Sequence, residues 1–596
     1  MVETRRQATD TSTTTDPAQP PVSGSGHDVL RDPEFPLFRL LPLRLVVPVL
    51  LVAAAASWGA VAGHAPIIAV VATGGGVVIA GLAPVRRRFP HSLAGVVALA
   101  IGYRWRRGRD RNRTHSEAFD LPLPEGGSCG ARWDGDRLTT MLRIDPPPDA
   151  LTLLRRGALS TDQLLPLAEI ARCLSQFDIT LASIDVISIG ARTAGTGFVA
   201  QLYERIIGPL PAIAHRTVWL VLQLDPLANA GAVDNRGGGG TGSVRSALIA
   251  TRRVANRLAA LDIAVSVLTA NEMNAAVRQL THGIPLDELA ETPNSLRHQG
   301  LHLTSYEIGA ELVNSAGFAA LWATPSVATT VNLRLRPVPS RPGRHDGPPV
   351  IVLDAVVRFY TNAEFTEAPV VGLRALPGRQ LPTLLETLPI GSRARGGAQT
   401  GHRGPLTALS ETVVPTAGCG QLIGADKLGQ GIAVPLVGYG TRHVEVVGKL
   451  DLAQQVVLRA IALGARVIVH TDRPEAWHPM VSNIHEPQWL SLAPRVAGTA
   501  QQIVAAAPQP GAPTPTATVL VYDGIAPTAS SGGATILYVR APHQPGGYFD
   551  PDVTLLQDEN APNSITVRTS TASASVQMVT TPDEMRYIGE SLVATR

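Results

Sequence analysis

Several stretches of the sequence carry residue types that could bind a ligand, and the clearest is residues 446–472. This stretch reads as strand, helix and strand, and it ends in Thr471 and Asp472. A dinucleotide site at such a βαβ unit needs the pattern G-x-G-x-x-G, because those glycines let the backbone approach a pyrophosphate. Gly448 stands alone here and is followed by Lys449. The nucleotide fingerprint is therefore absent.

The βαβ unit itself is well defined by its hydrophobic pattern. The sequence predicts a strand over 443–447, a helix, a C-terminal cap at Gly464 and a second strand over 466–470. The apolar face of the helix comprises Ala453, Val456, Val457, Ala460 and Ile461. Asp472 could bind a ribose, but Asp472 and Glu475 also form a D-x-x-E pattern around Pro474, which favours a helix cap.

Two glycine-rich stretches could hold a phosphate at a helix N-terminus. In "NRGGGGTGSVRS" (235–246), Gly237 and Gly242 have the P-loop separation, but Ser243 stands where that motif requires lysine. A flexible linker that ends in the cap of a helix over 244–258 is favoured over a phosphate cradle. In "GCGQLIGADKLGQG" (418–431) the glycines precede a strand, so a turn-rich loop is favoured over a phosphate site.

Catalytic and metal-binding patterns are also weak. The sequence contains no G-x-S-x-G, HExxH or deaminase pattern. His298 and His302 are four apart, but Gly300 weakens a helix between them, so surface histidines are favoured over metal ligands. The cysteines are Cys129, Cys173 and Cys419, which lack CxxC spacing and are expected to be small buried residues in a reducing compartment. We predict no catalytic residue, no cofactor site and no metal site, and hence no enzyme.

Two uncharged apolar runs near the N-terminus predict a transmembrane hairpin. Residues 45–62 and 65–84 are 18 and 20 residues long, which as helices would rise about 27 and 30 Å, close to one hydrocarbon core each. Only Gly63 and His64 lie between them. Arginines flank the pair on both sides, so the positive-inside rule places both termini in the cytoplasm. A cleaved signal peptide or two buried core helices are the alternatives.

The positive charge of the chain is concentrated after this hairpin. Residues 85–113 hold nine Arg and one Asp, although the whole chain has 51 Lys plus Arg against 48 Asp plus Glu. We expect the arginines of this stretch to meet anionic lipid headgroups, an interpretation favoured over nucleic acid by their position beside a membrane span. The basic residues predicted at the membrane interface are Arg86, Arg87, Arg88, Arg104, Arg106 and Arg107. The small residues predicted to pack helices are Gly74, Gly75, Gly76 and Gly81.

The rest of the chain alternates strand-like runs with helix-period stretches, which predicts an α/β fold. The whole is expected to be two transmembrane helices followed by a large cytoplasmic α/β body with Rossmann-like βαβ units. The predicted segments are a disordered tail (1–36), the hairpin with its basic segment (37–113), a first lobe (114–345), a bridging segment with a mobile loop (346–404) and a second lobe (405–596).

Four stretches in this arrangement resemble a known family. They are "GARWDGDRLTTMLRI" (130–144), "RTVWLVLQLDPLANAGAVDNRGGGGTG" (216–242), "GCGQLIGADKLGQGIAVPLVG" (418–438) and "LDLAQQVVLRAIALGARVIVHTDRPEAW" (450–477). Together with the apolar runs and the arginine-rich segment, they are similar to EccE, a membrane component of the ESX (type VII) secretion system. The resemblance covers most of residues 37–480, and no single motif in it carries a known chemistry.

The resemblance implies a structural, non-enzymatic subunit of an inner-membrane secretion complex. Its partners would be the EccB, EccC and EccD components, of which EccC is the ATPase, together with membrane lipids but no nucleic acid. The alternative is a membrane-tethered enzyme or sensor that binds a nucleotide or nucleotide-sugar at the sheet of the second lobe. The resemblance does not indicate which ESX system the chain serves.

Overall fold

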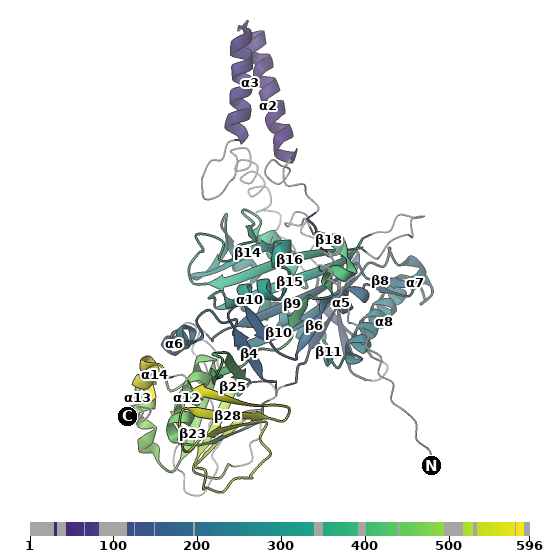
Figure 1. The fold of residues 1–596 in the computed structure, drawn as a ribbon. Coiled ribbons are helices and arrows are strands. Elements are labelled where there is room, and N and C mark those ends of the chain that lie inside the picture. Colours follow the sequence, from purple (N-terminus) through teal and green to yellow (C-terminus); the bar gives the residue numbers. More distant parts are fainter. Residues whose placement is uncertain are drawn as a thin grey trace, which may run out of the picture.

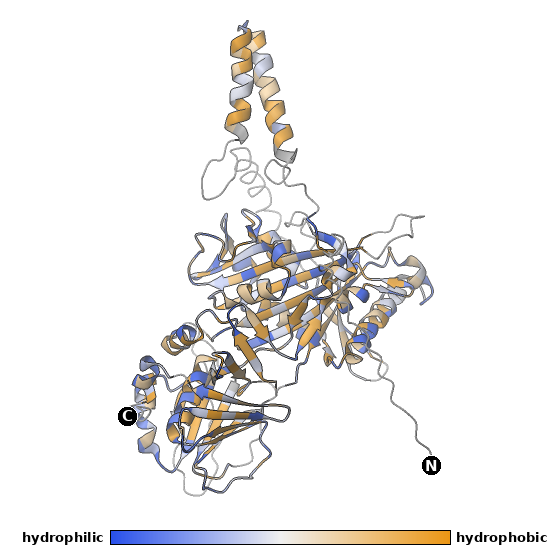
Figure 2. Cartoon of the chain, viewed as in Figure 1, coloured by the Kyte–Doolittle hydropathy of each residue, from blue (hydrophilic) through white to orange (hydrophobic). Residues whose placement is uncertain are grey.

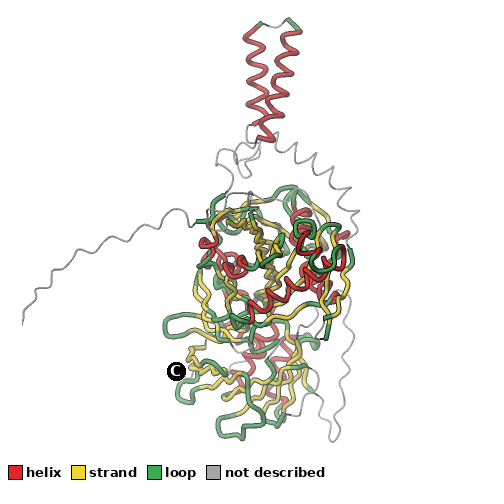
Figure 3. The backbone as a smooth tube through the Cα atoms, turned by 90° about the vertical axis from the view of Figure 1, so that its right-hand side faces the viewer, coloured by secondary structure: helices red, strands yellow, loops and turns green. Residues whose placement is uncertain are grey.

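The computed structural model of the chain consists of a helix pair, a larger body and a smaller body (Figure 1). The helix pair stands clear of both bodies, and the view turned by 90° shows the same separation (Figure 3). The residues that the structure describes are 29–32, 43–64, 66–82, 116–123, 126–147, 150–194, 197–338, 350–390, 401–438, 441–493, 517–527, 533–578 and 580–588.

The larger body is built on a sheet of 13 strands. Its main path runs β1-β2-β3-β10-β9-β15-β16-β14-β13-β12, with β11, β17 and β18 paired beside it, and all the pairs are antiparallel. The strands are β1 (Ala118–Pro122), β2 (Ser128–Asp134), β3 (Arg137–Ile144), β9 (Ser183–Ala191), β10 (His215–Leu224), β11 (Val265–Val267), β12 (Ala290–Glu291), β13 (Leu296–His298), β14 (Leu301–Ile308), β15 (Ala328–Pro337), β16 (Val350–Thr361), β17 (Leu373–Ala375) and β18 (His402–Pro405).

Helices cover both faces of this sheet. On β9, Ile184 and Val186 enter one hydrophobic cluster and Ile187 and Ile189 enter another, as the two-residue period of a strand requires. The first cluster also contains residues of α5 (Leu167–Arg172), α8 (Gly239–Ala259) and α10 (Ser315–Ala323). The second contains residues of α9 (Ala270–Leu280) and α11 (Gln380–Thr387). The larger body is therefore a three-layer structure.

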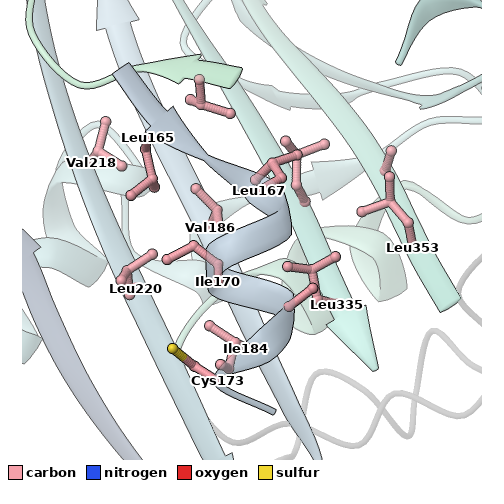
Figure 4. Packing of buried hydrophobic residues seen from close by; sticks show 14 of the residues in the cluster. Leu165, Leu167, Ile170, Cys173, Ile184, Val186, Val218, Leu220, Leu335 and Leu353 are labelled. Carbon is pink, nitrogen blue, oxygen red and sulfur yellow. The ribbon is translucent and has the colours of Figure 1, made fainter. Parts of the chain in front are cut away.

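Helix α5 illustrates this packing (Figure 4). Leu167 and Ile170 lie three apart on the helix and belong to the same hydrophobic cluster as Ile184 of β9 and Leu220 of β10. All four side chains are fully buried. Burying a side chain of this size contributes about 1.5–3 kcal/mol, so this short helix is held by its contacts with the sheet.

The smaller body contains a mixed sheet of 12 strands. Its order is β24-β23-β25-β26-β22-β27-β28-β29-β20-β21-β4-β5, parallel from β24 to β27 and antiparallel afterwards. The strands are β4 (Thr152–Arg155), β5 (Ala158–Ser160), β20 (Gln421–Ala425), β21 (Gly431–Val434), β22 (His443–Val447), β23 (Ala465–Thr471), β24 (Leu490–Leu492), β25 (Ala517–Asp523), β26 (Thr535–Arg540), β27 (Val553–Gln557), β28 (Ser564–Thr569) and β29 (Ser573–Met578).

The βαβ unit at 443–471 lies where the sequence predicts it. Helix α12 (Leu450–Ala462) follows β22 and precedes β23, and Gly464 takes the left-handed conformation (φ 88°) between helix and strand. Every residue from Asp451 to Ala462 is buried, not only the predicted apolar face. Helix α12 is enclosed because α6 (Phe198–Ile207) and α14 (Pro582–Ile588) also pack against it.

A buried ion pair joins α12 to α14. Arg459 Nε lies 2.8 Å from Glu584 Oε1, and the two side chains are 1% and 0% exposed. Arg459 also donates to the carbonyl oxygens of Leu422 (2.9 Å) and Ile423 (3.0 Å) on β20. One guanidinium therefore connects a helix, a strand and the last described helix of the chain.

The two bodies are joined by pairing and by buried polar contacts. Strand β4 belongs to the first half of the chain but pairs with β21 of the smaller body. Ala194 N donates to Ala462 O at 2.9 Å, and His215 Nε2 lies 2.8 Å from Leu463 O. Burial lowers the pKa of His215, so the ring is neutral at neutral pH and its N–H donates to this carbonyl.

The helix pair corrects the prediction of two transmembrane spans. The helices are α2 (Leu43–Ala62) and α3 (Ile67–Leu82), which pack side by side around the turn at Gly63 and His64. Figure 2 shows that much of their surface is apolar. Within the part of the chain that the structure describes, however, no helix combines the length and the apolar character needed to cross a bilayer.

The expected membrane-spanning hairpin is therefore contradicted, and length gives the physical reason. Helix α3 begins only after Pro66 and has 16 residues, so it rises about 24 Å, short of the roughly 30 Å of a hydrocarbon core. The uncharged part of α2 after Arg44 has 18 residues and a proline, Pro48, and rises about 27 Å. The fold is a mixed α/β fold rich in sheet, and among the described strands the parallel βαβ connections lie in the smaller body.

A few residues of the predicted N-terminal tail lie against the larger body. Arg31 exchanges two backbone hydrogen bonds with Arg403 of β18, both 2.8 Å. Asp32 lies 2.8 Å from the guanidinium of Arg374 and 2.7 Å from Nδ1 of His402. The remaining predicted domain boundaries stay predictions, and β16 and α11 of the larger body lie within the segment expected to bridge the lobes.

Breaking the Arg459–Glu584 pair should destabilise the smaller body. Arg459→Met or Glu584→Gln leaves one buried partner without its counter-charge, and we expect the free energy of unfolding to fall by about 3–5 kcal/mol. Chemical denaturation of the purified chain measures this change. The double variant Arg459→Met/Glu584→Leu removes both charges and should recover part of the loss; a double variant as unstable as the sum of the singles would contradict this account.

Candidate functional site at the carboxyl edge of the smaller sheet

The carboxyl ends of the parallel strands β22, β23, β25, β26 and β27 meet at one edge of the smaller sheet. Open α/β sheets bind ligands at this edge, so a nucleotide would be expected here. The edge brings together the turn after β22, the turn after β23 and the last residues of β25, β26 and β27. The geometry of these side chains decides whether the edge is open.

The turn after β22 has no free amide at its first two positions. Gly448 N donates to Arg540 O at 3.0 Å, and Lys449 N donates to Gln557 Oε1 at 2.7 Å. A Cβ at Gly448 would lie 2.5 Å from Gln557 Oε1, so the glycine is needed for the approach of this side chain. A phosphate cradle needs such backbone amides to point at the ligand. Here a strand carbonyl and a glutamine side chain already occupy them.

Arg540 is likewise engaged at this edge. Its Nε donates to Glu445 Oε1 of β22 at 2.8 Å, and its side chain is 18% exposed. The pair joins β26 to β22 across the register that pairs these strands. The guanidinium of Arg540 therefore forms an ion pair with Glu445 that links two strands of the sheet.

Asp523 at the end of β25 is the most constrained carboxylate of the edge. It is 0% exposed and accepts from Thr471 Oγ1 (2.9 Å), Arg473 Nε (2.9 Å) and the indole N–H of Trp477 (2.9 Å). Its hydrogen bond with Arg473 raises the pKa of that guanidinium. A carboxylate with these partners fixes the turn after β23 and is not placed as a free acid, base or metal ligand.

The predicted capping box at Asp472 and Glu475 is wrong. The turn after β23 is a short 3₁₀ segment, η4 (Pro474–Ala476), whose N-cap is Arg473 and which has no side-chain cap. Helix α13 (His478–Ile484) follows with Trp477 as its N-cap. The backbone takes this path because Thr471, Arg473 and Trp477 all turn toward Asp523.

The glycine-rich stretch at 235–246 packs two helices closely and is not an open linker. Helix α8 begins at Gly239, earlier than predicted, directly after α7 (Ala230–Asp234). A Cβ at Gly242 would lie 2.2 Å from Val233 O. Ser243 donates to Gly239 O at 2.7 Å within the helix. The glycines therefore permit close approach of α7 and α8.

The stretch at 418–431 forms a β-hairpin, not a loop. It contains β20, a turn and the first residue of β21. A Cβ at Gly418 would lie 2.2 Å from Ala214 O, and one at Gly424 would lie 2.3 Å from Gln577 O. These glycines allow the hairpin to pack against neighbouring backbone. No phosphate-binding geometry arises from them.

The histidine pair lies on two strands. His298 ends β13 and His302 lies in β14, joined by a turn with Gln299 (φ 45°) and Gly300 (φ 87°). His302 is buried, with Nδ1 3.3 Å from Ser295 Oγ, so the expectation that it is a surface residue is wrong. Across the described residues, no three His, Cys, Asp or Glu side chains gather as a metal site would require.

The cysteines are buried and free, as the sequence predicts. Burial raises the pKa of Cys129 to about 11 and that of Cys419 to about 12. Because the thiolate is the reactive form, both thiols are inert at neutral pH.

The predicted interface residues fall in two groups. Arg86, Arg87, Arg88, Arg104, Arg106 and Arg107 lie outside the described residues. The predicted packing glycines lie on α3. A Cβ at Gly74 would lie 2.5 Å from Ser57 Oγ of α2, so this glycine packs the helix pair itself, whereas Gly75 and Gly76 have nothing within 4 Å.

Comparison with known proteins agrees with the resemblance seen in the sequence. Residues 212–308, which run from the end of the α6–β10 connection to β14, match the family model named EccE, described in terms of the type VII ESX secretion system translocon. The ESX-2 secretion system protein EccE2 of Mycobacterium tuberculosis is 26% identical over 346 residues, which are 58% of this chain and 60% of that protein.

Two further relatives carry the same family name. The ESX-5 protein EccE5 of Mycobacterium marinum is 28% identical over 283 residues, which are 44% of this chain and 65% of the relative. The ESX-1 protein EccE1 of Mycolicibacterium smegmatis is 31% identical over 165 residues, or 26% of this chain and 34% of the relative. Over these stretches the chain is similar to EccE proteins of three ESX systems. Its alignments with these three relatives each cover less than two thirds of the relative's length.

Sequence reasoning missed the residues that organise this chain most strongly. Asp523, Glu584 and Arg459 are buried charges whose partners lie far away in the sequence. A local signal was present for Glu584, because Thr581 and Glu584 form a T-x-x-E capping box at the start of α14, with Thr581 N donating to Glu584 at 3.1 Å. No comparable local signal marks Asp523.

Asp523 should stabilise the edge without contributing to any reaction. Thr471, Arg473 and Trp477 all donate hydrogen bonds to the Asp523 carboxylate, and Asp523→Asn removes its negative charge. We expect the free energy of unfolding to fall by about 2 kcal/mol. Thermal unfolding of the purified chain measures the loss. Glu475→Gln, an exposed carboxylate two residues beyond Arg473, is the control and should stay within about 0.5 kcal/mol of the parent. Equal effects of the two changes would contradict the role of Asp523.

Proposed function

We propose that this chain is a structural subunit of a type VII (ESX) protein secretion complex at the inner membrane. The observation that carries the proposal is the likeness to EccE proteins named for the ESX-1, ESX-2 and ESX-5 systems. A subunit of this kind acts by holding other components in place. The two large sheets and the buried contacts that join them provide a rigid body suited to that task.

We propose further that the chain catalyses no reaction. In support, the edge where an α/β sheet would bind a nucleotide has its first two turn amides bonded within the protein, and Asp523 is enclosed by three donors. A nucleotide would have to displace Gln557 and the Arg540 carbonyl before it met the turn. Breaking these hydrogen bonds costs free energy, and this cost would reduce the affinity for the nucleotide.

The proposed partners are the EccB, EccC and EccD components of the same complex, of which EccC supplies ATP hydrolysis. We propose that the bodies lie on the cytoplasmic side and that the stretch holding Arg86, Arg87, Arg88, Arg104, Arg106 and Arg107 meets anionic lipid headgroups. The support for this attachment is the charge of that stretch, nine Arg against one Asp in residues 85–113.

The helix pair is proposed to bind a helix of another subunit. Support comes from the exposed apolar side chains of α2 and α3, among them Leu51, Trp58, Ile67, Ile68 and Ile79. Gly75 and Gly76 are exposed, with no atom near their missing Cβ positions. A bare glycine surface lets a second helix approach to close backbone contact. Gly74 is not available for this purpose, since it faces Ser57.

Affinity purification of the tagged chain in mild detergent tests the proposed complex. We expect an ATPase and a many-span membrane protein to co-purify, and a chain recovered alone would count heavily against the proposal. Gly75→Leu/Gly76→Leu should reduce the recovery of partners several-fold, because leucine side chains would hold a docking helix away. Gly59→Leu, at a glycine of α2 that is equally open, is the matched control; equal losses in both variants would argue against a specific contact at Gly75 and Gly76.

A nucleotide screen tests the absence of a ligand at the sheet edge. A ligand present at a hundred times its Kd would add about 2.7 kcal/mol of stability. We expect nucleoside triphosphates and nucleotide sugars to leave the thermal unfolding of the purified chain unchanged. Stabilisation that disappears in Gln557→Ala would show that the edge does open for a ligand, and the non-enzymatic assignment would then have to be withdrawn.

A further inference from the structure

A hollow of about 660 Å³ lies where a strand pair from the first half of the chain joins the smaller sheet. Three turns surround it: the turn between β4 and β5, the chain that follows α6, and the turn between β20 and β21. The lining residues are Arg155, Arg156, Ile207, Pro209, Leu210, Leu428, Gly429 and Gln430. The hollow belongs to neither the sheet edge nor the helix pair.

The turn between β20 and β21 holds an apolar side chain out in solvent. Asp426 Oδ1 accepts from Leu428 N (2.9 Å) and Gln430 N (2.8 Å), and Asp426 O accepts from Gly429 N (3.0 Å). These bonds fix the turn, and Gly429 takes a left-handed φ of 75°. Leu428 is 80% exposed as a result. A leucine on a rigid turn can contribute apolar contact without losing backbone freedom on binding.

The apolar floor of the hollow consists of Ile207, Pro209 and Leu210, and hydrogen bonds from Arg192 hold this segment in place. Pro209 and Leu210 follow the end of α6, and Ile207 is buried. The carbonyls of Gly208 and Leu210 accept from the guanidinium of Arg192 at 2.5 and 3.1 Å, and Arg192 is 1% exposed. The apolar residues of the floor are therefore presented in one arrangement, as a preformed binding surface requires.

One rim of the hollow is positively charged. Arg155 and Arg156 are exposed; Arg155 ends β4, and Arg156 forms the two-residue turn to β5 with Gly157, whose φ is 70°. Among the described residues neither arginine forms an ion pair, and the lining contains no Asp or Glu. Asp426 lies nearby in the chain, but its carboxylate is committed to the amides of its own turn. The rim therefore attracts carboxylates.

We propose that this hollow binds an extended segment of a partner protein that carries carboxylates beside a leucine-type side chain. The apolar floor would receive the aliphatic group, and Arg155 and Arg156 would pair with the acidic groups at the rim. The lining includes no aromatic residue on which a nucleic-acid base could stack. A concave site between three turns suits one inserted side chain better than a flat lipid surface. This inference stands independently of the secretion role.

Because its lining comes from both halves of the chain, the hollow depends on how β4, β5 and α6 sit against the smaller sheet. Arg192 on one side and the β4–β21 pairing on the other maintain that relation. A segment bound here would brace the same junction. Docking would then stabilise the union of the two bodies.

Fluorescence anisotropy of the purified chain tests the proposal with a short fluorescein-labelled peptide of alternating Glu and Leu residues. We expect saturable binding that weakens as salt is raised. Arg155→Glu/Arg156→Glu should raise the Kd about tenfold or more, since two attractive contacts become repulsive. Leu428→Ser should weaken binding by a few-fold. Both changes are at exposed positions, so thermal unfolding should remain that of the parent.

Matched controls separate this site from general charge. Arg297→Glu reverses an exposed arginine on β13 of the larger body and should leave the Kd unchanged, and peptides of alternating Gln and Leu or Lys and Leu should not bind. Failure of the Glu and Leu peptide to bind, or equal weakening by Arg297→Glu and the rim variant, would overturn the proposal. So would binding to vesicles of anionic lipid that the rim variant abolishes while the peptide does not bind, because the rim would then recognise lipid.

Discussion

The enclosed guanidinium of Arg459 is the contact on which the smaller body depends. A charge at 1% exposure is tolerable only if it is paired and its other donors are satisfied. Glu584 and the carbonyls of Leu422 and Ile423 meet this condition together. Helix α12 can therefore be buried on every side, although Asp451, Gln454, Gln455 and Arg459 are polar. The last described helix, α14, is required to cover it, which ties the C-terminal region to the centre of the sheet.

A similar constraint holds the two bodies together. Strands β4 and β5 leave the larger body and complete the smaller sheet, while Ala194 N and His215 donate to the carbonyls of Ala462 and Leu463 across the junction. Arg216 is partly buried there, stacked 4.1 Å over the ring of Trp322, and desolvation lowers its pKa to about 10. These contacts use backbone and polar groups as well as apolar area. Relative motion of the bodies would break several hydrogen bonds at once, so the bodies act as one support.

The sequence predicts the local parts of this architecture well. The βαβ unit at 443–471, the cap at Gly464 and the buried cysteines follow from periodicity and residue type, because these signals act over a few residues. The pairing of thirteen antiparallel strands does not follow, since each partner is chosen by long-range packing. The membrane-spanning prediction rested on the lengths of two uncharged runs and on the arginines that flank them, and the bounds of the described helices contradict it. At the sheet edge, the sequence showed that the dinucleotide fingerprint is absent around Gly448. It gave no sign of the roles of Asp523 and Gln557, because their partners are distant in the chain.

The contact between Asp32 and Arg374 has a mechanical consequence for the helix pair. Residues 29–32 are clamped to β18 on the larger body, and α2 begins at Leu43. Ten residues separate the clamp from the helix, and a fully extended chain of that length reaches about 36 Å at most. This length limits how far the start of α2 can lie from residues 29–32. A force applied to the helix pair would therefore reach the larger body at two places: the edge where β18 meets β16, and the start of β1 on the other side of the pair.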